Sequence, residues 1–147
     1  MANPNRVGSN TQDNFGNYRI ANADAVSLGT AANAVITLPV LGGGTGGTTQ
    51  YIVRRIVVSN LTNSAGGTAP SAATANVSVG TTNDGANLVA SVTKLTNLTA
   101  GTRFVDLTLD ANAASNVYTA NALYLNVQTA VANAAVSIKV YADVGPF

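Results

Sequence analysis

Aspartate is the only acidic residue type in this chain of 147 residues, so any acid-base chemistry would have to rest on it. Six aspartates are present, whereas His, Cys and Glu are absent. The common general bases and the Ser-His and Cys-His pairs therefore cannot be assembled. Asp106 and Asp110 share one face of a predicted strand, but about 13 Å separates them, more than the roughly 5–10 Å between glycosidase carboxylates. We expect no catalytic site and no enzyme.

Two loops could in principle hold a ligand. Residues 110–116, DANAASN, offer Asp110, Asn112 and Asn116 as oxygen ligands but lack the Gly and the final Glu of a calcium loop. The glycine-rich run at 42–49 lacks the Lys-Ser/Thr that closes a phosphate-binding loop. We therefore expect a turn and a flexible loop, with no metal and no cofactor.

Charge and hydropathy narrow the choice of partners. Charged residues make up 9% of the chain, against about 25% in a typical soluble domain. With a net charge of +1 and no basic cluster, neither nucleic acid nor a membrane is expected as a partner. We expect a soluble protein made without a signal peptide, because the N-terminus lacks the apolar region of such a signal. So few charges protect poorly against association, which favours a surface covered by other subunits.

The elements that must position these residues are β-strands, because apolar residues recur with period two between turn formers. Strands are predicted at 26–29, 34–40, 51–60, 76–80, 87–95, 103–110, 123–129 and 136–144. Asp84-Gly85 marks a hairpin between two of them. We expect an all-β fold, a single antiparallel β-sandwich or jelly roll of about eight strands.

The N-terminal region differs from the rest in composition. Residues 1–24 are rich in Asn and sparse in apolar residues, which predicts an extended arm preceding a sandwich domain at 25–147. We expect the arm to be ordered only against another subunit. Phe15 and Tyr18 are its candidate contact residues.

The strand YIVRRIVVSN at 51–60 has two mostly apolar faces, each with one arginine. A regular strand would place one face in the core and the other against a second subunit. A β-bulge at Arg54-Arg55 would instead turn both arginines outward, leaving inside the residues Tyr51, Val53, Ile56 and Val58. We favour the bulge, because it avoids burying Arg54 unpaired.

Either alternative leaves an apolar strip with a positive centre on the outer face of this strand. Arg54, Arg55 and Val57 are the candidate interface anchors. Asp106 or Asp110 of a neighbouring strand or subunit is the candidate counter-charge. We expect self-association through this face, as a homotrimer.

The run YIVRRIVVSN, the small-residue loop after it and the later segments VDLTLD, ALYLNV and SIKVY resemble small β-sandwich virion proteins of tailed bacteriophages. These proteins decorate or cement a capsid, and the resemblance covers residues 50–144. It implies a non-enzymatic structural protein on the capsid surface, made in the host cytoplasm. It also implies that the major capsid protein is a partner. We expect the homotrimer to lie at a three-fold or quasi-three-fold position of the capsid.

A carbohydrate- or receptor-binding module of a phage tail or fibre is the alternative. Exposed tyrosines would then stack on sugar rings, and the candidates are Tyr18, Tyr118, Tyr124 and Tyr141. Because aromatic residues make up only 5% of the chain and Trp is absent, packing and interface roles are favoured for them.

Overall fold

The structure, a computed structural model, describes residues 18–30, 34–39, 50–70, 74–83, 86–96, 98–99 and 104–145. For Tyr18 and residues 34–39 it describes the backbone alone. The described residues form strands and turns and no helix. Among them, accordingly, no helix has the length and hydropathy needed to cross a membrane.

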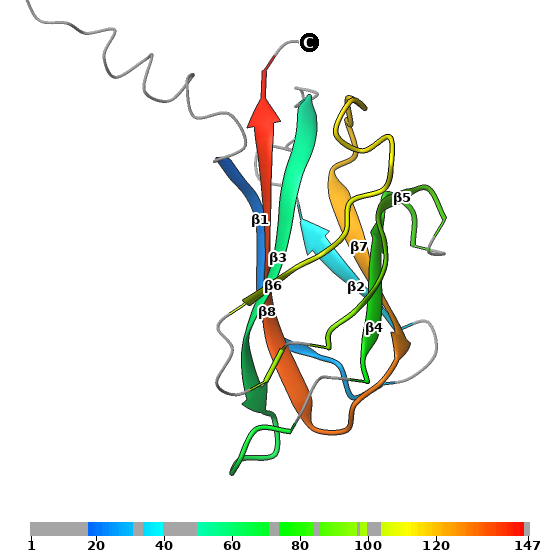
Figure 1. The fold of residues 1–147 in the computed structure, drawn as a ribbon. Coiled ribbons are helices and arrows are strands. Elements are labelled where there is room, and N and C mark those ends of the chain that lie inside the picture. Colours follow the sequence, from blue (N-terminus) through cyan, green and yellow to red (C-terminus); the bar gives the residue numbers. More distant parts are fainter. Residues whose placement is uncertain are drawn as a thin grey trace, which may run out of the picture.

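Eight strands form two sheets that face each other (Figure 1). The strands are β1 (Tyr18–Ser27), β2 (Ala34–Pro39), β3 (Tyr51–Asn63), β4 (Asn76–Gly80), β5 (Leu88–Lys94), β6 (Phe104–Asp106), β7 (Ala122–Thr129) and β8 (Ala134–Val144). One sheet has the order β1-β8-β3-β6 and the other β2-β7-β4-β5, and all pairs are antiparallel. The predicted all-β antiparallel sandwich is confirmed, while the jelly-roll alternative stays a prediction.

The core lies between the two sheets and follows the alternation in the sequence. In β7, Leu123, Leu125 and Val127 are fully buried, as their spacing predicts. In β8, Val136, Ile138, Val140 and Ala142 occupy the equivalent inward positions. Burying a side chain of this size contributes roughly 1.5–3 kcal/mol, so these alternating positions fix which face of each strand points inward.

The strand β1 differs from the expected arm at 1–24 and the expected short strand at 26–29. It begins at Tyr18 and pairs with β8 along the edge of the sheet, so residues 18–24 belong to the sheet. Ile20 and Ala21 are both buried, and the pairing slips between Arg19 and Ala21 and again between Ala23 and Val26. These irregularities break the period-two pattern that would have revealed the strand. Residues 1–17, with Phe15, lie outside the described residues.

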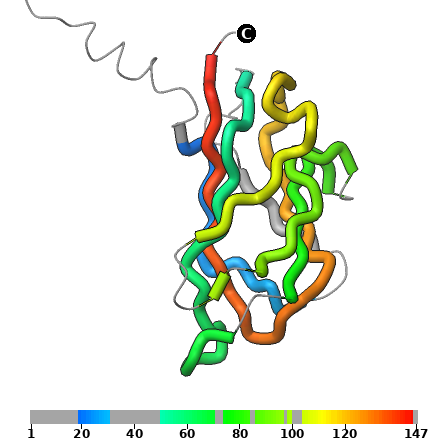
Figure 2. The backbone as a smooth tube through the Cα atoms, in the orientation of Figure 1, coloured from blue at the N-terminus to red at the C-terminus, as the bar shows by residue number. Residues whose placement is uncertain are grey.

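The predicted strand at 103–110 is divided between the two sheets. Only β6 pairs with β3, and the Leu107 amide still donates to the Ile56 carbonyl oxygen. The chain then crosses to β5, where the Ser91 amide donates to the Thr108 carbonyl oxygen (Figure 2). It returns to the first sheet where Tyr118 pairs with Tyr51. This segment covers one edge of the sandwich and holds β6 on β3.

Other strand predictions hold with shifts of a few residues. β2 lies at the edge of its sheet and ends at Pro39, as a proline within that run predicts. β4 and β5 pair as the predicted hairpin. The hairpin residues Asp84 and Gly85, and the glycine-rich run at 42–49, lie outside the described residues.

Candidate interaction surface

A β-bulge in β3 decides where the two arginines point. Val53 lies opposite Ala142 of β8 and Arg55 lies opposite Tyr141, so β3 contains one extra residue at Arg54. The side chains of Arg54 and Arg55 are 40% and 47% exposed. Fully buried on the inner face are Tyr51, Val53, Ile56 and Val58. The predicted bulge is confirmed.

Arg54 is tied into its own chain. Its Nε donates to Asp143 Oδ2 at 2.6 Å, and its Nη1 donates to the Ala114 carbonyl oxygen at 2.8 Å. Asp143 is only 4% exposed, so the arginine compensates a buried carboxylate. Arg54 therefore joins β3, β8 and the turn at 110–116. Asp143 was not among the predicted site residues, although alternation along β8 places it on the same face as Tyr141.

Arg55 forms a forked ion pair with Asp106 of β6. Its Nε donates to Asp106 Oδ1 and its Nη2 donates to Oδ2 at 3.0 Å. This hydrogen bonding raises the pKa of Arg55 above its ordinary value. The guanidinium carbon also lies 5.1 Å from the centre of the Phe104 ring, a cation-π distance. Of the two predicted counter-charges, Asp106 is thus placed beside Arg55, on a neighbouring strand of the same chain.

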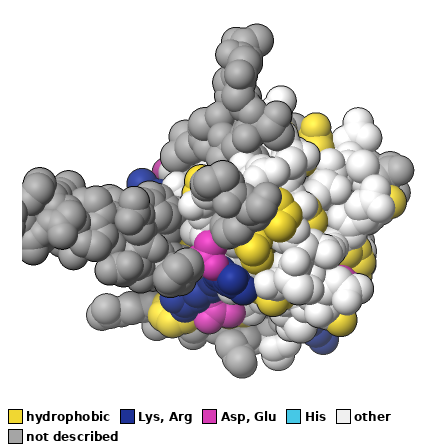
Figure 3. Space-filling view, turned by 90° about the horizontal axis from the view of Figure 1, so that it is seen from above, with side chains coloured by type: hydrophobic (Ala, Val, Ile, Leu, Met, Phe, Trp, Pro, Cys, Tyr) yellow, Lys and Arg dark blue, Asp and Glu magenta, His cyan; other side chains and the backbone are white. Residues whose placement is uncertain are grey.

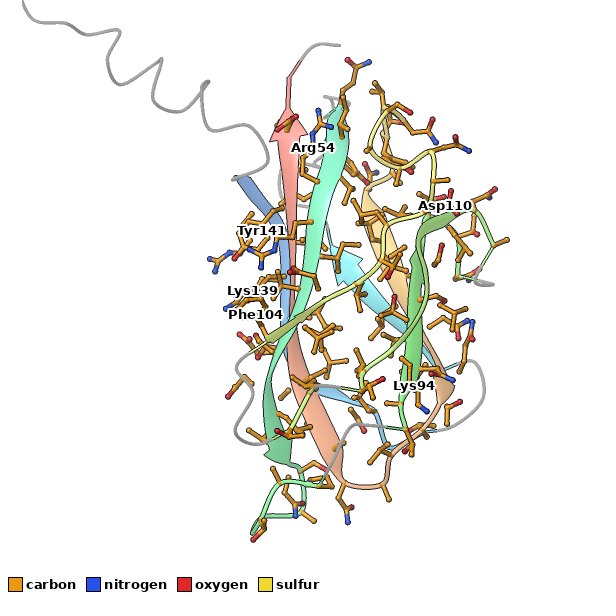
Figure 4. The ribbon with its side chains drawn as sticks, in the orientation of Figure 1. Arg54, Lys94, Phe104, Asp110, Lys139 and Tyr141 are labelled. Atoms are coloured by element: carbon orange, nitrogen blue, oxygen red, sulfur yellow. The ribbon has the colours of Figure 1, made fainter. Side chains whose placement is uncertain are left out.

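Asp110 lies apart from the arginines, next to the other sheet (Figure 4). Its backbone amide donates to the Val89 carbonyl oxygen of β5, and its Oδ1 accepts from the Asn112 amide. The Asn116 amide donates to the Asn112 carbonyl oxygen. Residues 110–116 are therefore the turn that the sequence predicts. Within the described part of the chain, no group of three His, Cys, Asp or Glu side chains could hold a metal ion.

The outer face of the β1-β8-β3-β6 sheet contains a hollow of about 350 Å³. Six residues line it: Arg55, Val57, Ser59, Phe104, Lys139 and Tyr141. Val57 pairs with Asp106 on one side and Lys139 on the other, and it is only 8% exposed. Phe104 is 50% exposed. Phe104, Lys139 and Tyr141 lie on the same side of the sheet (Figure 4).

The exposed apolar group of this face is therefore Phe104 rather than the predicted Val57. Neighbouring long side chains cover Val57, because it lies between Asp106 and Lys139 in the sheet. Phe104 and Lys139 were not among the predicted site residues. Alternation places both on outer faces, but the strand order β8-β3-β6 that brings them together is not visible in a single sequence.

Both signs of charge occur around the hollow. Asp24 of β1 accepts hydrogen bonds from Ser137 and Asn22, and these bonds, together with the charges of Lys139 and Arg19, lower the pKa of Asp24. A view from above shows basic and acidic side chains side by side in one patch, with hydrophobic side chains at its border (Figure 3). The Arg55–Asp106 ion pair beside the hollow is thus formed within the chain, whereas Lys139 has no ion pair among the described residues.

The tyrosines proposed for sugar stacking have different positions. The ring centre of Tyr118 lies 5.9 Å from that of Tyr51, and Tyr118 is partly buried. Tyr124 is partly buried in the other sheet, and the side chain of Tyr18 is not among those described. Tyr141 lines the hollow.

No protein-family model, curated protein or solved structure matches this chain. The fold, the bulge and the hollow are the observations from which its function is inferred.

Proposed function

We propose that this chain is a non-enzymatic structural protein of a bacteriophage virion, which decorates or cements the capsid by binding between major capsid protein subunits. Its contact surface is the outer face of the β1-β8-β3-β6 sheet. The observation that carries the proposal is the bulge that turns Arg54 and Arg55 outward beside the exposed ring of Phe104.

The composition of this face supports a protein partner. Arginine and aromatic residues are enriched in protein interfaces, and Arg55, Phe104 and Tyr141 surround the hollow. Both arginines already have carboxylate partners in their own chain. A partner can therefore cover the two arginines without leaving either of their charges unpaired, which is the costly outcome of burying an ion.

The same face supports self-association. A surface of single-sign charge would repel its own copy, whereas here each arginine is paired and both signs lie close together. The low content of charged residues in the whole chain also favours association. A homotrimer placed at a three-fold position of the capsid fits this surface and the resemblance to capsid-decorating proteins.

Purified virus particles provide the test. Particles from a lysate of the source are separated on a density gradient, and their proteins are identified by mass spectrometry. The chain is expected in the particle fraction together with the major capsid protein, in many copies. Its absence from complete particles would contradict the proposal.

Rebinding identifies the contact surface. Particles stripped of the protein should rebind the wild type and Val92→Glu but not Phe104→Glu. Val92 is a matched control, because it is 49% exposed against 50% for Phe104 and lies on the other sheet. Equal rebinding of both variants would show that another face makes the contact.

A carbohydrate-binding module is the second candidate, and one observation favours it. Tyr141 and Phe104 flank a hollow that also contains Lys139 and Ser59 as hydrogen-bond donors. A glycan array would detect such binding. Recognition of a glycan by the wild type that Tyr141→Ala abolishes would favour this candidate over capsid binding.

A further inference from the structure

We propose that the hollow receives residues 11–17 of a second copy of the chain, with the Asp13 carboxylate at Lys139 and the Phe15 ring against Phe104. This inference rests on the proposed self-association, and it names the segment that occupies the contact surface.

Three polar side chains that line the hollow have no hydrogen-bond partner among the described residues. Among the described residues, the side chains of Lys139, Ser59 and Tyr141 form no hydrogen bond and no ion pair, although Lys139 acts on Asp24 through its charge. Asp106, the neighbouring carboxylate, is already engaged by Arg55. None of the six lining residues is acidic. An occupant that brings a carboxylate therefore complements the hollow.

The hollow also has an apolar side. The guanidinium of Arg55 lies over the Phe104 ring, yet half of this side chain remains exposed. Val57 lies among the lining residues close by. An occupant with an aromatic ring next to its carboxylate would cover both parts of the hollow, and burying such a ring contributes several times more than one exposed ion pair.

Residues 11–17, TQDNFGN, supply this combination. Asp13 and Phe15 are two residues apart, and the segment contains no basic residue. In an extended chain, side chains two residues apart point to the same side, about 7 Å from each other. Lys139 on β8 and Phe104 on β6 lie two strand spacings apart and are offset by two residues along the strands, roughly 12 Å in all. Side chains of this length can bridge the difference.

The register of β1 directs the segment to another copy. Arg19 and Asn22 of β1 pair with Tyr141 and Lys139, so the hollow lies alongside β1 after Tyr18. The axis of β1, extended beyond Tyr18, leads away from the hollow of the same chain. A segment that precedes Tyr18 would have to turn back to enter that hollow, which favours the hollow of a second copy.

This contact joins an N-terminal segment on one copy to a sheet face on the next. Such a head-to-tail contact closes into a ring when the rotation between copies allows it. The arrangement is therefore compatible with the expected trimer, and each hollow is complete only with the neighbour's segment.

A charge swap in the full chain tests the proposed ion pair. Asp13→Lys and Lys139→Asp should each raise the dissociation constant of the oligomer at least about tenfold in sedimentation experiments, and the double variant should recover most of the loss. Lys94→Asp is the matched control, because Lys94 is exposed on the other sheet (Figure 4) and should change nothing. No effect of the single variants, or no recovery in the double variant, would overturn the proposal.

Cross-linking distinguishes insertion of the segment into a second copy from insertion into the same chain. The chain has no cysteine of its own, so only the introduced cysteines can form a disulfide. Asp13→Cys mixed with Lys139→Cys should form an intermolecular disulfide, because the proposal places these two side chains together, while Asp13→Cys mixed with the exposed-site variant Val92→Cys should not. A monomeric cross-link in the Asp13→Cys, Lys139→Cys double variant at high dilution would place the segment in its own hollow and refute exchange between copies. Detection of the chain in virus particles does not depend on these results, so the two proposals fail separately.

Discussion

The two adjacent arginines of β3 differ in what they stabilise. Arg54 compensates Asp143, which is 4% exposed, whereas Arg55 pairs with Asp106, which is about half exposed. Arg54→Met should therefore lower the free energy of unfolding by about 2 kcal/mol, because it removes the guanidinium that compensates the buried charge of Asp143. Arg55→Met should cost less than about 1 kcal/mol, as for other exposed pairs. Urea unfolding measures both, and equal losses would contradict these assignments.

Tyr51 makes the stability sensitive to alkaline pH. Its side chain is fully buried and its hydroxyl donates to the Ala120 carbonyl oxygen at 2.9 Å. Burial, and to a smaller extent the neighbouring Tyr118, raises the pKa of Tyr51 above its ordinary value. Above pH ~10 the unfolded chain loses this proton while the folded chain keeps it. The free energy of unfolding should therefore stay constant with respect to this group below pH ~10 and decrease above it.

Tyr51→Phe isolates this effect. The variant should lose about 1 kcal/mol at pH 7, because the hydrogen bond to Ala120 is removed, and should lose less additional stability than the wild type between pH 9 and pH 11. Unfolding curves at these pH values make the comparison. A decline of the same steepness in both proteins would show that Tyr51 is not the titrating group.

At the residue scale, the energetic cost of burying a charge without a partner was the most informative criterion for reading the sequence. The cost of burying Arg54 unpaired was sufficient to predict the bulge, and the alternation at 103–110 placed Asp106 outward as a partner. Asp143 and Phe104 could not be assigned, because their partners come from strands far apart in the sequence. Such contacts depend on strand order, which local patterns do not contain.

At the scale of elements, regular strands were predictable and irregular ones were not. β4, β7 and β8 combine an unbroken alternation with clear turns, and their predicted bounds lie within two residues of the observed ones. β1 contains two slips in register, and β6 ends where the chain crosses to the other sheet. Bulges and crossings break the period on which such predictions depend.

Two truncations separate β1 from the residues before it. Deleting residues 1–17 should leave the sandwich folded while weakening self-association and attachment to the particle. Deleting residues 1–24 should destabilise the fold by several kcal/mol, because it also removes the buried Ile20 and Ala21 and exposes the edge of β8. Circular dichroism with thermal unfolding distinguishes them. If the shorter deletion unfolds the protein as well, residues before Tyr18 belong to the fold.

At the scale of the whole molecule, the sandwich has one distinctive outer face. The β1-β8-β3-β6 sheet presents the hollow, both arginine pairs and the exposed ring of Phe104. A specific interface normally buries more than about 1,000 Å² and depends on a few anchors. Arg55 and Phe104, which contact each other, are the anchors that this face offers.

Sedimentation equilibrium of three proteins tests most directly whether this face is the contact surface. The wild type should be a trimer at micromolar concentration, Phe104→Glu should be a folded monomer, and Val92→Glu should remain a trimer. The two variants introduce the same charge at sites of equal exposure on opposite sheets, 50% and 49%. A monomeric wild type, or a trimer that Val92→Glu dissociates and Phe104→Glu does not, would contradict the account.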